Sequence, residues 1–158
     1  MVTADLCASL AQALLARRWS LATAESCTGG MIAAACTDQS GSSNWFERGF
    51  VTYSNAAKTE CLGVPAPLIV QHGAVSEPVV WAMARGAISH SHADVSIAVT
   101  GVAGPAGGSA DKPVGTVWFG WSVGGQVAAE MQRFAGDRAA VRRATVEHAL
   151  RLLLRELA

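Results

Sequence analysis

The fold is decided by the stretch Ser20-Leu-Ala-Thr-Ala-Glu-Ser-Cys-Thr-Gly-Gly30 and the apolar residues 31–36 that follow it. Residues 20–25 are short and predict a β-strand, whereas residues 26–37 predict a helix that starts from a glycine-containing turn. A strand that passes through a tight turn into a helix is the repeating unit of α/β proteins. The stretch therefore predicts a sheet covered by helices.

Hydrophobic periodicity outside this unit predicts further helices and strands in alternation. Helices are predicted over residues 3–18, 56–62, 76–90 and 138–158, and β-structure over residues 45–53, 95–100, 114–123 and 126–134. Ser76 is expected to cap its helix, and Gly63 is expected to end the preceding one. Gly124-Gly125 predicts a hairpin. The pattern indicates one α/β domain over residues 1–158, a three-layer α/β/α sandwich with a mixed sheet.

The composition excludes several classes of protein. Of 158 residues, 51% are hydrophobic and 15% are charged, which is the opposite of a disordered chain. Twelve basic residues balance twelve acidic ones, so no nucleic-acid partner is expected. The apolar runs are too short to span a membrane, and the N-terminal segment resembles a helix rather than a signal peptide. The four cysteines form no Cys-x-x-Cys pair and no histidine has finger-like spacing, so no metal site is expected. Because no secretion signal is recognised, we expect a cytoplasmic protein with reduced thiols. No cofactor is expected.

Ser26 is the first candidate for a chemical role. It is predicted to lie between a strand and a helix, beside Cys27, Thr28, Gly29 and Gly30. Unpaired amides and the dipole at a helix start can stabilise an anion, so a nucleophilic serine there would have a backbone oxyanion hole. The alternative is that Ser26 only caps the helix and that the glycines only permit close packing.

Lys58 and Tyr53 form the second candidate. No histidine partner for Ser26 is evident, so Lys58 is the natural general base if burial or a neighbouring positive charge lowers its pKa. Tyr53 could relay a proton or hold that base. The alternative is a solvated helix lysine and a packing tyrosine.

A long glycine-rich loop and an arginine cluster are the third candidate. Residues 100–116 match neither a P-loop nor a dinucleotide-binding fingerprint, yet their amides could surround a phosphate or a ribose. The alternative is a structural connection. Arg142, near the start of the last helix, is the side chain that we expect to reach an anionic substrate, although it could also belong to a solvated face.

These motifs occur together in one known family. The matching segments are Ala24-Glu-Ser-Cys-Thr-Gly-Gly30, Gly41-Ser-Ser43, Phe46-Glu-Arg-Gly-Phe-Val-Thr-Tyr-Ser-Asn55, Ala57-Lys58, Gly73-Ala-Val-Ser-Glu77, Val99-Thr-Gly-Val-Ala-Gly-Pro105, Lys112-Pro-Val-Gly115 and Gly136-Asp-Arg138. Over nearly its whole length the chain resembles the CinA C-terminal domain family, in the stand-alone form without the N-terminal nucleotide-hydrolase-like module. Enzymatic members of that family are nicotinamide mononucleotide amidohydrolases.

The resemblance implies specific roles. Ser26 corresponds to the nucleophile, Lys58 and Tyr53 to its partners, and the loop that contains Thr100, Gly101, Ala103 and Gly104 to the wall of the substrate pocket. The chain departs from the family pattern at Ala106, where glycine is common. The implied reaction is deamidation of nicotinamide mononucleotide in pyridine nucleotide salvage, with no cofactor.

Two questions stay open in the sequence. A non-catalytic nucleotide-binding domain, or an interaction domain associated with competence or DNA damage, is the alternative function, because fold alone fixes no activity. Five tryptophans are many for this length and suggest a homo-oligomer, but core packing explains them equally well.

Overall fold

The structure is a computed structural model that describes residues 2–158, so the predicted domain is covered except for its first residue. Its helices are α1 (Thr3–Arg17), α2 (Met31–Thr37), α3 (Asn55–Leu62), α4 (Ala66–His72), α5 (Glu77–Ser89) and α6 (Arg138–Glu156), with a short 3₁₀ turn, η1 (Ser42–Asn44). Its strands are β1 (Leu21–Glu25), β2 (Phe46–Val51), β3 (Val95–Gly101), β4 (Thr116–Val123) and β5 (Gln126–Arg133). Helical and strand segments alternate as far as β3, as the hydrophobic pattern predicts, with three successive helices between β2 and β3.

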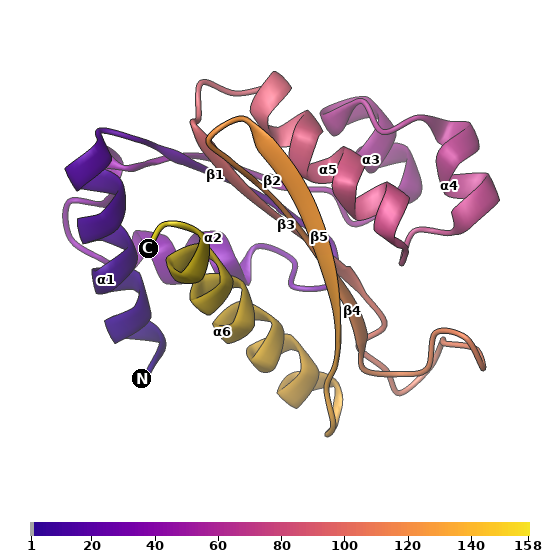
Figure 1. Ribbon diagram of the computed structural model, residues 1–158. Helices are drawn as coiled ribbons and strands as arrows, with labels where there is room; N and C mark the ends of the chain where they lie inside the picture. The colour runs from indigo at the N-terminus through magenta and orange to yellow at the C-terminus, as the bar shows by residue number, and fades with distance from the viewer. Residues whose placement is uncertain (1) are drawn as a thin grey trace.

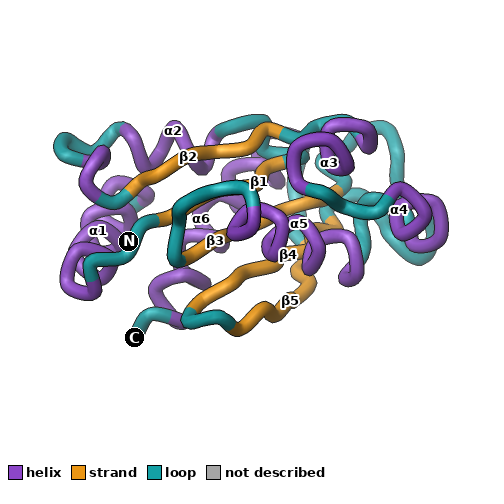
Figure 2. Tube along the Cα trace, turned by 90° about the horizontal axis from the view of Figure 1, so that it is seen from above, coloured by secondary structure: helices purple, strands orange, loops and turns teal. Residues whose placement is uncertain are grey.

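The strands form one five-stranded mixed sheet in the order β2-β1-β3-β4-β5 (Figure 2). β2, β1 and β3 are parallel, and β4 and β5 continue the sheet as an antiparallel hairpin. The hairpin turns at Gly124 and Gly125, whose φ angles of +60° and +81° suit a two-residue turn of the type that matches strand twist. Because β2, β1 and β3 are parallel, their carboxyl ends all lie at the same end of the sheet.

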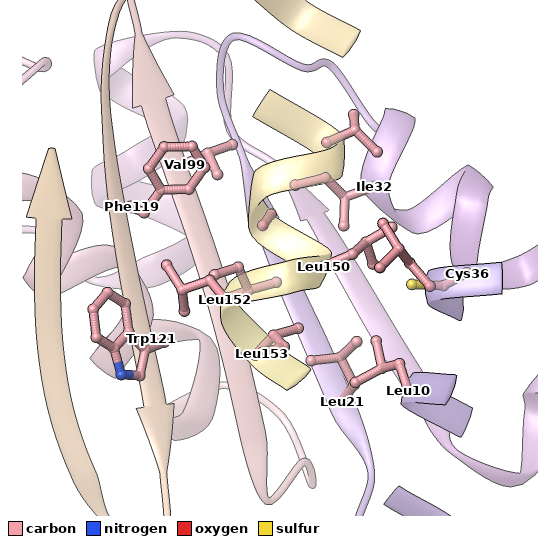
Figure 3. Close-up of a cluster of buried hydrophobic side chains, with 14 of the residues drawn as sticks. Leu10, Leu21, Ile32, Cys36, Val99, Phe119, Trp121, Leu150, Leu152 and Leu153 are labelled. Atoms are coloured by element: carbon pink, nitrogen blue, oxygen red, sulfur yellow. The ribbon is translucent and has the colours of Figure 1, made fainter. Parts of the chain in front are cut away.

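Helices cover both faces of this sheet, which confirms the predicted three-layer sandwich. Helices α1, α2 and α6 lie on one face, and α3, α4 and α5 lie on the other (Figure 1). The first face has a large aliphatic core in which Leu150 and Leu153 of α6 pack with Leu21, Val99 and Phe119 of the strands (Figure 3). Each fully buried leucine of this kind contributes about 1.5–3 kcal/mol by leaving water.

The second face is built from smaller side chains. Ala22, Ala24 and Ala98 of the sheet face Val80 and Met83 of α5. Small residues on the strands let α5 pack close to this face of the sheet, whereas larger side chains fill the space on the opposite face. No helix between residues 2 and 158 combines the length and the hydropathy needed to cross a lipid bilayer.

Three details differ from the sequence prediction. Helix α2 begins at Met31 rather than at Ser26, because residues 26–30 form successive turns. The segment after Pro65 forms α4, which the two prolines concealed because they occupy the N-cap and the first turn, where no amide is needed. Ser76 is at the N-cap of α5 as predicted, but its hydroxyl donates to the carbonyl of Gly73 instead of capping the helix.

The tryptophans are distributed between core and surface. Trp45 and Trp121 are buried, whereas Trp81 is partly exposed on α5. Core packing thus accounts for part of the tryptophan content, and the oligomeric state stays a prediction.

Candidate active site

The candidate site lies where the parallel strands end. In a sheet ordered β2-β1-β3, the connection from β1 runs to β2 on one side, and the later connection from β2 crosses back to β3 on the other side. The loops after β1 and β3 therefore diverge and open a crevice there. Ser26 follows β1 directly, and its amide donates to the carbonyl of Val99 in β3 at 3.1 Å. On the other side, the amide of Thr52 donates to the carbonyl of Glu25 at 2.9 Å. Strand pairing thus fixes the backbone that carries Ser26.

Ser26 and Lys58 are brought into direct contact. Lys58 is in the first turn of α3, which Ser54 caps by accepting a 3.0 Å hydrogen bond from the amide of Ala57. Its Nζ lies 3.0 Å from Oγ of Ser26. The lysine side chain is only 1% exposed, which is unusual for this residue type. A buried amine beside a serine hydroxyl is the arrangement that a serine–lysine pair requires.

The surroundings of Lys58 shift its pKa downward. Burial lowers the pKa of the Lys58 ammonium, because a charged group is disfavoured away from water. Within residues 2–158 no carboxylate forms an ion pair with it; instead Nζ donates to the carbonyls of Thr52 at 3.0 Å and Tyr53 at 3.2 Å. A neutral amine can give its two protons to these carbonyls and direct its lone pair at Ser26.

Hydrogen bonds to the carboxylate of Glu25 stabilise the turn after Ser26. This carboxylate is 1% exposed and accepts from the hydroxyl of Thr28 at 2.6 Å and from the amides of Ile32 at 2.8 Å and Ala33 at 3.0 Å. The amides of Ile32 and Ala33 in the first turn of α2 are therefore occupied by the Glu25 carboxylate and are not free for a substrate oxyanion. Through these contacts Glu25 anchors the turn.

Two other amides remain available next to the serine. The turn closes through the amide of Gly29, which donates to the carbonyl of Ser26 at 3.1 Å, and it needs glycine because Gly29 and Gly30 have φ angles of +59° and +106°. In the described part of the chain, the amides of Cys27 and Thr28 donate no hydrogen bond to another residue. They follow the serine directly, as oxyanion donors do in many acyl-transfer sites.

The thiol of the neighbouring Cys27 is expected to be a poor nucleophile. Cys27 is buried, and burial raises the pKa of its thiol to about 11. The thiol therefore stays protonated near neutral pH, where only a thiolate would be a strong nucleophile. Of the two adjacent side chains, the hydroxyl of Ser26 is the one in contact with the amine of Lys58.

A cavity of about 310 Å³ opens at the pair. Its lining includes eight of the predicted site residues, namely Ser26, Cys27, Tyr53, Lys58, Thr100, Gly101, Ala103 and Gly104. The glycine-rich loop supplies one wall and projects beyond the end of the sheet at the lower right of Figure 1. Of the other predicted residues, Thr28, Gly29 and Gly30 belong to the turn after Ser26, and neither they nor Arg142 line this cavity. Ala106, the departure from the family pattern, is part of the wall.

Tyr53 and Arg138 connect two walls of the cavity. Arg138 donates to the hydroxyl oxygen of Tyr53 at 3.1 Å and to the carbonyl of Gly104 at 2.9 Å. Tyr53 is 58% exposed, so its ring stands at the mouth rather than in the interior. Because its oxygen accepts from Arg138, the proton of its own hydroxyl can be donated into the cavity.

Arg142 contacts the protein backbone rather than the cavity. Its Nε donates to the carbonyl of Cys27 at 3.1 Å, and its terminal nitrogen donates to the carbonyl of Thr28 at 3.3 Å. It also borders a neighbouring hollow of about 640 Å³, which Arg138, Ala103 and Gly104 share with the first.

Sequence reasoning missed two contributors to the site. Arg138 is in a family segment but gave no signal of its own, because an arginine just after an N-cap usually faces water. Glu25 is the last residue of an apolar strand and is buried. A carboxylate at such a position indicates a structural or functional role, because a buried carboxylate needs hydrogen-bond donors. Ala74 and Val75 complete the wall, and Thr100 fastens them by donating to the carbonyl of Ala74 at 3.0 Å.

Other hollows lack comparable chemistry. A groove of about 610 Å³ between α3, α4 and α5 is lined mainly by apolar residues such as Leu62, Leu68 and Trp81. Among residues 2–158, no group of three or more His, Cys, Asp or Glu side chains is placed to hold a metal ion.

Comparison with known proteins finds relatives that match most of the chain. The chain is 54% identical over 153 residues to the nicotinamide-nucleotide amidohydrolase PncC of Enterobacter agglomerans, covering 96% of this chain and 93% of that one. It is 61% identical over 132 residues to the protein of the same name from Pseudomonas putida, covering 84% and 82%. The crystal structure of competence damage-inducible protein A from Klebsiella pneumoniae superposes with a TM-score of 0.96 at 44% identity, covering 99% of this chain and 98% of that chain.

The family is settled by a match along almost the whole chain. The family model described as the CinA C-terminal domain matches residues 3–157, a range that contains every segment of the site described above. With relatives more than half identical and a solved structure of the same fold, the chain belongs to the CinA C-terminal domain family.

Proposed function

We propose that this protein hydrolyses the carboxamide of nicotinamide mononucleotide to nicotinate mononucleotide and ammonia, with Ser26 as nucleophile and Lys58 as general base. The 3.0 Å contact between a buried lysine and a serine in a shared cavity carries this proposal. Two relatives named nicotinamide-nucleotide amidohydrolase supply the substrate class. The small molecule is the only partner that the mechanism needs, and the reaction belongs in the cytoplasm, where pyridine nucleotides are recycled.

The first half of the reaction forms an acyl-enzyme. Neutral Lys58 takes the proton of the Ser26 hydroxyl, and Oγ forms a bond to the carboxamide carbon. The resulting oxyanion lies near Cys27 and Thr28, whose backbone N–H groups can donate hydrogen bonds to it. Loss of one such donor typically raises the activation free energy by about 3 kcal/mol. When the C–N bond breaks, the departing nitrogen receives the proton held by Lys58, either directly or through Tyr53, which is then reprotonated from Lys58. The nitrogen leaves as ammonia, and Lys58 is neutral again.

The second half returns the enzyme to its starting state. Water gives a proton to Lys58 and attacks the ester carbon, and the ester bond to Ser26 breaks. The proton then returns to Oγ, and nicotinate mononucleotide leaves. No step needs a metal or a cofactor, because the covalent intermediate and the backbone donors do the chemistry. Arg138 and the loop amides at the cavity wall are suited to the ribosyl phosphate, since arginine binds phosphate well.

A binding domain without activity is the less economical reading. Lys58 is buried, contacts a hydroxyl at a cavity and has a lowered pKa. Ionisable groups perturbed in this way are concentrated at catalytic sites, which favours the enzyme.

An ammonia-release assay over three amides tests the proposal. The purified protein is incubated with nicotinamide mononucleotide, with free nicotinamide and with glutamine, and nicotinate mononucleotide is followed by chromatography. We expect equal amounts of ammonia and nicotinate mononucleotide from the first compound and little ammonia from the other two, because they lack the ribosyl phosphate. Preferred hydrolysis of glutamine or of free nicotinamide would assign a different substrate. Absence of ammonia release from all three compounds would contradict the proposed amidase activity.

The pH dependence of kcat/KM reports on the base. The reaction needs the neutral amine, so activity is low below the pKa of Lys58 and rises with pH through it. Burial lowers that pKa, so the midpoint of the rise is expected below the value of about 10.4 for an exposed lysine. Initial rates at subsaturating substrate across the pH range measure the midpoint. Activity that falls as pH rises through the neutral range would exclude Lys58 as the base.

A further inference from the structure

Arg142 reaches the catalytic turn from a different layer of the protein. It projects from the second turn of α6, where its neighbour Val141 is fully buried and fixes the helix against the core. From there its guanidinium bridges two successive carbonyls, those of Cys27 and Thr28, at 3.1 and 3.3 Å. The planar fork of arginine can hold two acceptors at once, which lysine cannot do in the same way.

Because the peptide group is planar, contacts that fix a carbonyl also fix the direction of the N–H of the next residue. In a planar trans peptide the C=O and the N–H of the next residue point in opposite directions. Holding the carbonyl of Cys27 toward Arg142 therefore directs the amide of Thr28 away from Arg142. In the same way, the carbonyl of Ser26 is taken into the turn by the amide of Gly29, so the amide of Cys27 points out of the turn.

We propose that Arg142 is a positioning residue that holds the Ser26–Gly29 turn so that the amides of Cys27 and Thr28 face the developing oxyanion. This inference rests on the proposed function. Glu25 holds the same turn through the hydroxyl of Thr28, so the turn has one charged anchor on either side. Without Arg142 the Cys27–Thr28 peptide can rotate, and the donors would no longer be preorganised when charge develops.

This role differs from that of a substrate ligand. Arg142 uses Nε and a terminal nitrogen on the backbone and does not line the cavity at Ser26, whereas Arg138 does. A phosphate ligand acts on substrate affinity, and its removal raises KM. A residue that orients oxyanion donors acts in the transition state, and its removal lowers kcat.

Steady-state kinetics of three variants separates the two roles. Arg142→Ala, Arg142→Lys and the matched control Arg143→Ala, an exposed arginine on the same helix, are assayed with nicotinamide mononucleotide and with nicotinamide riboside, which has the same amide but no phosphate. For Arg142→Ala we expect kcat on the mononucleotide to fall about 10- to 100-fold with KM within about threefold of wild type. Its kcat/KM falls by the same factor on the riboside. Arg142→Lys recovers only part of the loss, and Arg143→Ala matches wild type.

Different results would overturn the inference. A KM for the mononucleotide raised tenfold with unchanged kcat, and no change on the riboside, would make Arg142 a phosphate ligand. Wild-type kinetics in both Arg142 variants would remove any role. Circular dichroism at the assay temperature gives the folded fraction, so a loss that only tracks unfolding counts against positioning; Arg142→Lys, which keeps the charge and the stem, serves if the alanine variant unfolds. Failure of the proposed function looks different, because then wild-type enzyme releases no ammonia from the mononucleotide.

Discussion

Replacing Ser26 with alanine is expected to lower the rate of ammonia release from nicotinamide mononucleotide by at least about 10⁴-fold, as removing the nucleophile does in other serine hydrolases. The hydroxyl is the atom that forms the covalent bond, and Cys27 cannot replace it because burial raises its thiol pKa to about 11. Discontinuous ammonia assays with high enzyme concentration measure the residual rate.

The fold is expected to survive this change. Ser26 is 9% exposed and its hydroxyl has Lys58 as its partner, so alanine removes one contact and creates no large void. Ser43→Ala, in an exposed turn, is the matched control and should keep wild-type activity. Full turnover by Ser26→Ala with a normal melting temperature would show that another residue attacks the amide.

Replacing Lys58 with methionine is expected to lower kcat about 10²- to 10⁴-fold, the usual contribution of a general base. Methionine fills the volume of the lysine stem but has no lone pair of sufficient basicity for Ser26. Lys58→Arg should fail to restore activity although it keeps the charge, because a guanidinium stays protonated near neutral pH.

The matched control for this position is Glu60→Gln, an exposed residue of the same helix. It should leave kcat and the acid limb of the pH profile unchanged. Near-normal turnover by Lys58→Arg would mean that a positive charge, rather than a base, is what the site requires at this position. Thermal unfolding of each variant, followed by circular dichroism, confirms that the comparison is made between folded proteins.

Much of the fold could be predicted because it depends on local patterns. The apolar run of β3, the glycine pair between β4 and β5 and the face of α6 that contains Val141, Thr145 and Leu152 are all readable from spacing. Helix α4 was not readable, since its two prolines suggest a break and its seven residues are too few for a clear periodicity. The sequence predicts the start of α2 five residues too early, because a serine before glycines is typical of a helix cap even where the N-cap is Gly30.

The site was predictable in its residue types but not in its contacts. Ser26 and Lys58 are 32 positions apart, and only the parallel pairing of β1 with β2 brings the following segments together. The interpretation of Arg142 as a substrate ligand used the charge and the forked geometry of arginine, and it stays a prediction. In the folded chain its partners are carbonyls 115 and 114 positions away, which no spacing rule could anticipate.

Mass spectrometry of the enzyme quenched in acid during turnover tests the central claim, that Ser26 is acylated with the help of Lys58. The account predicts a transient adduct equal in mass to the mononucleotide minus ammonia, mapped by proteolysis to the peptide containing Ser26 and strongly reduced in Lys58→Met. An adduct on Cys27 or on any residue outside this turn, or an adduct that forms equally fast without Lys58, would contradict it.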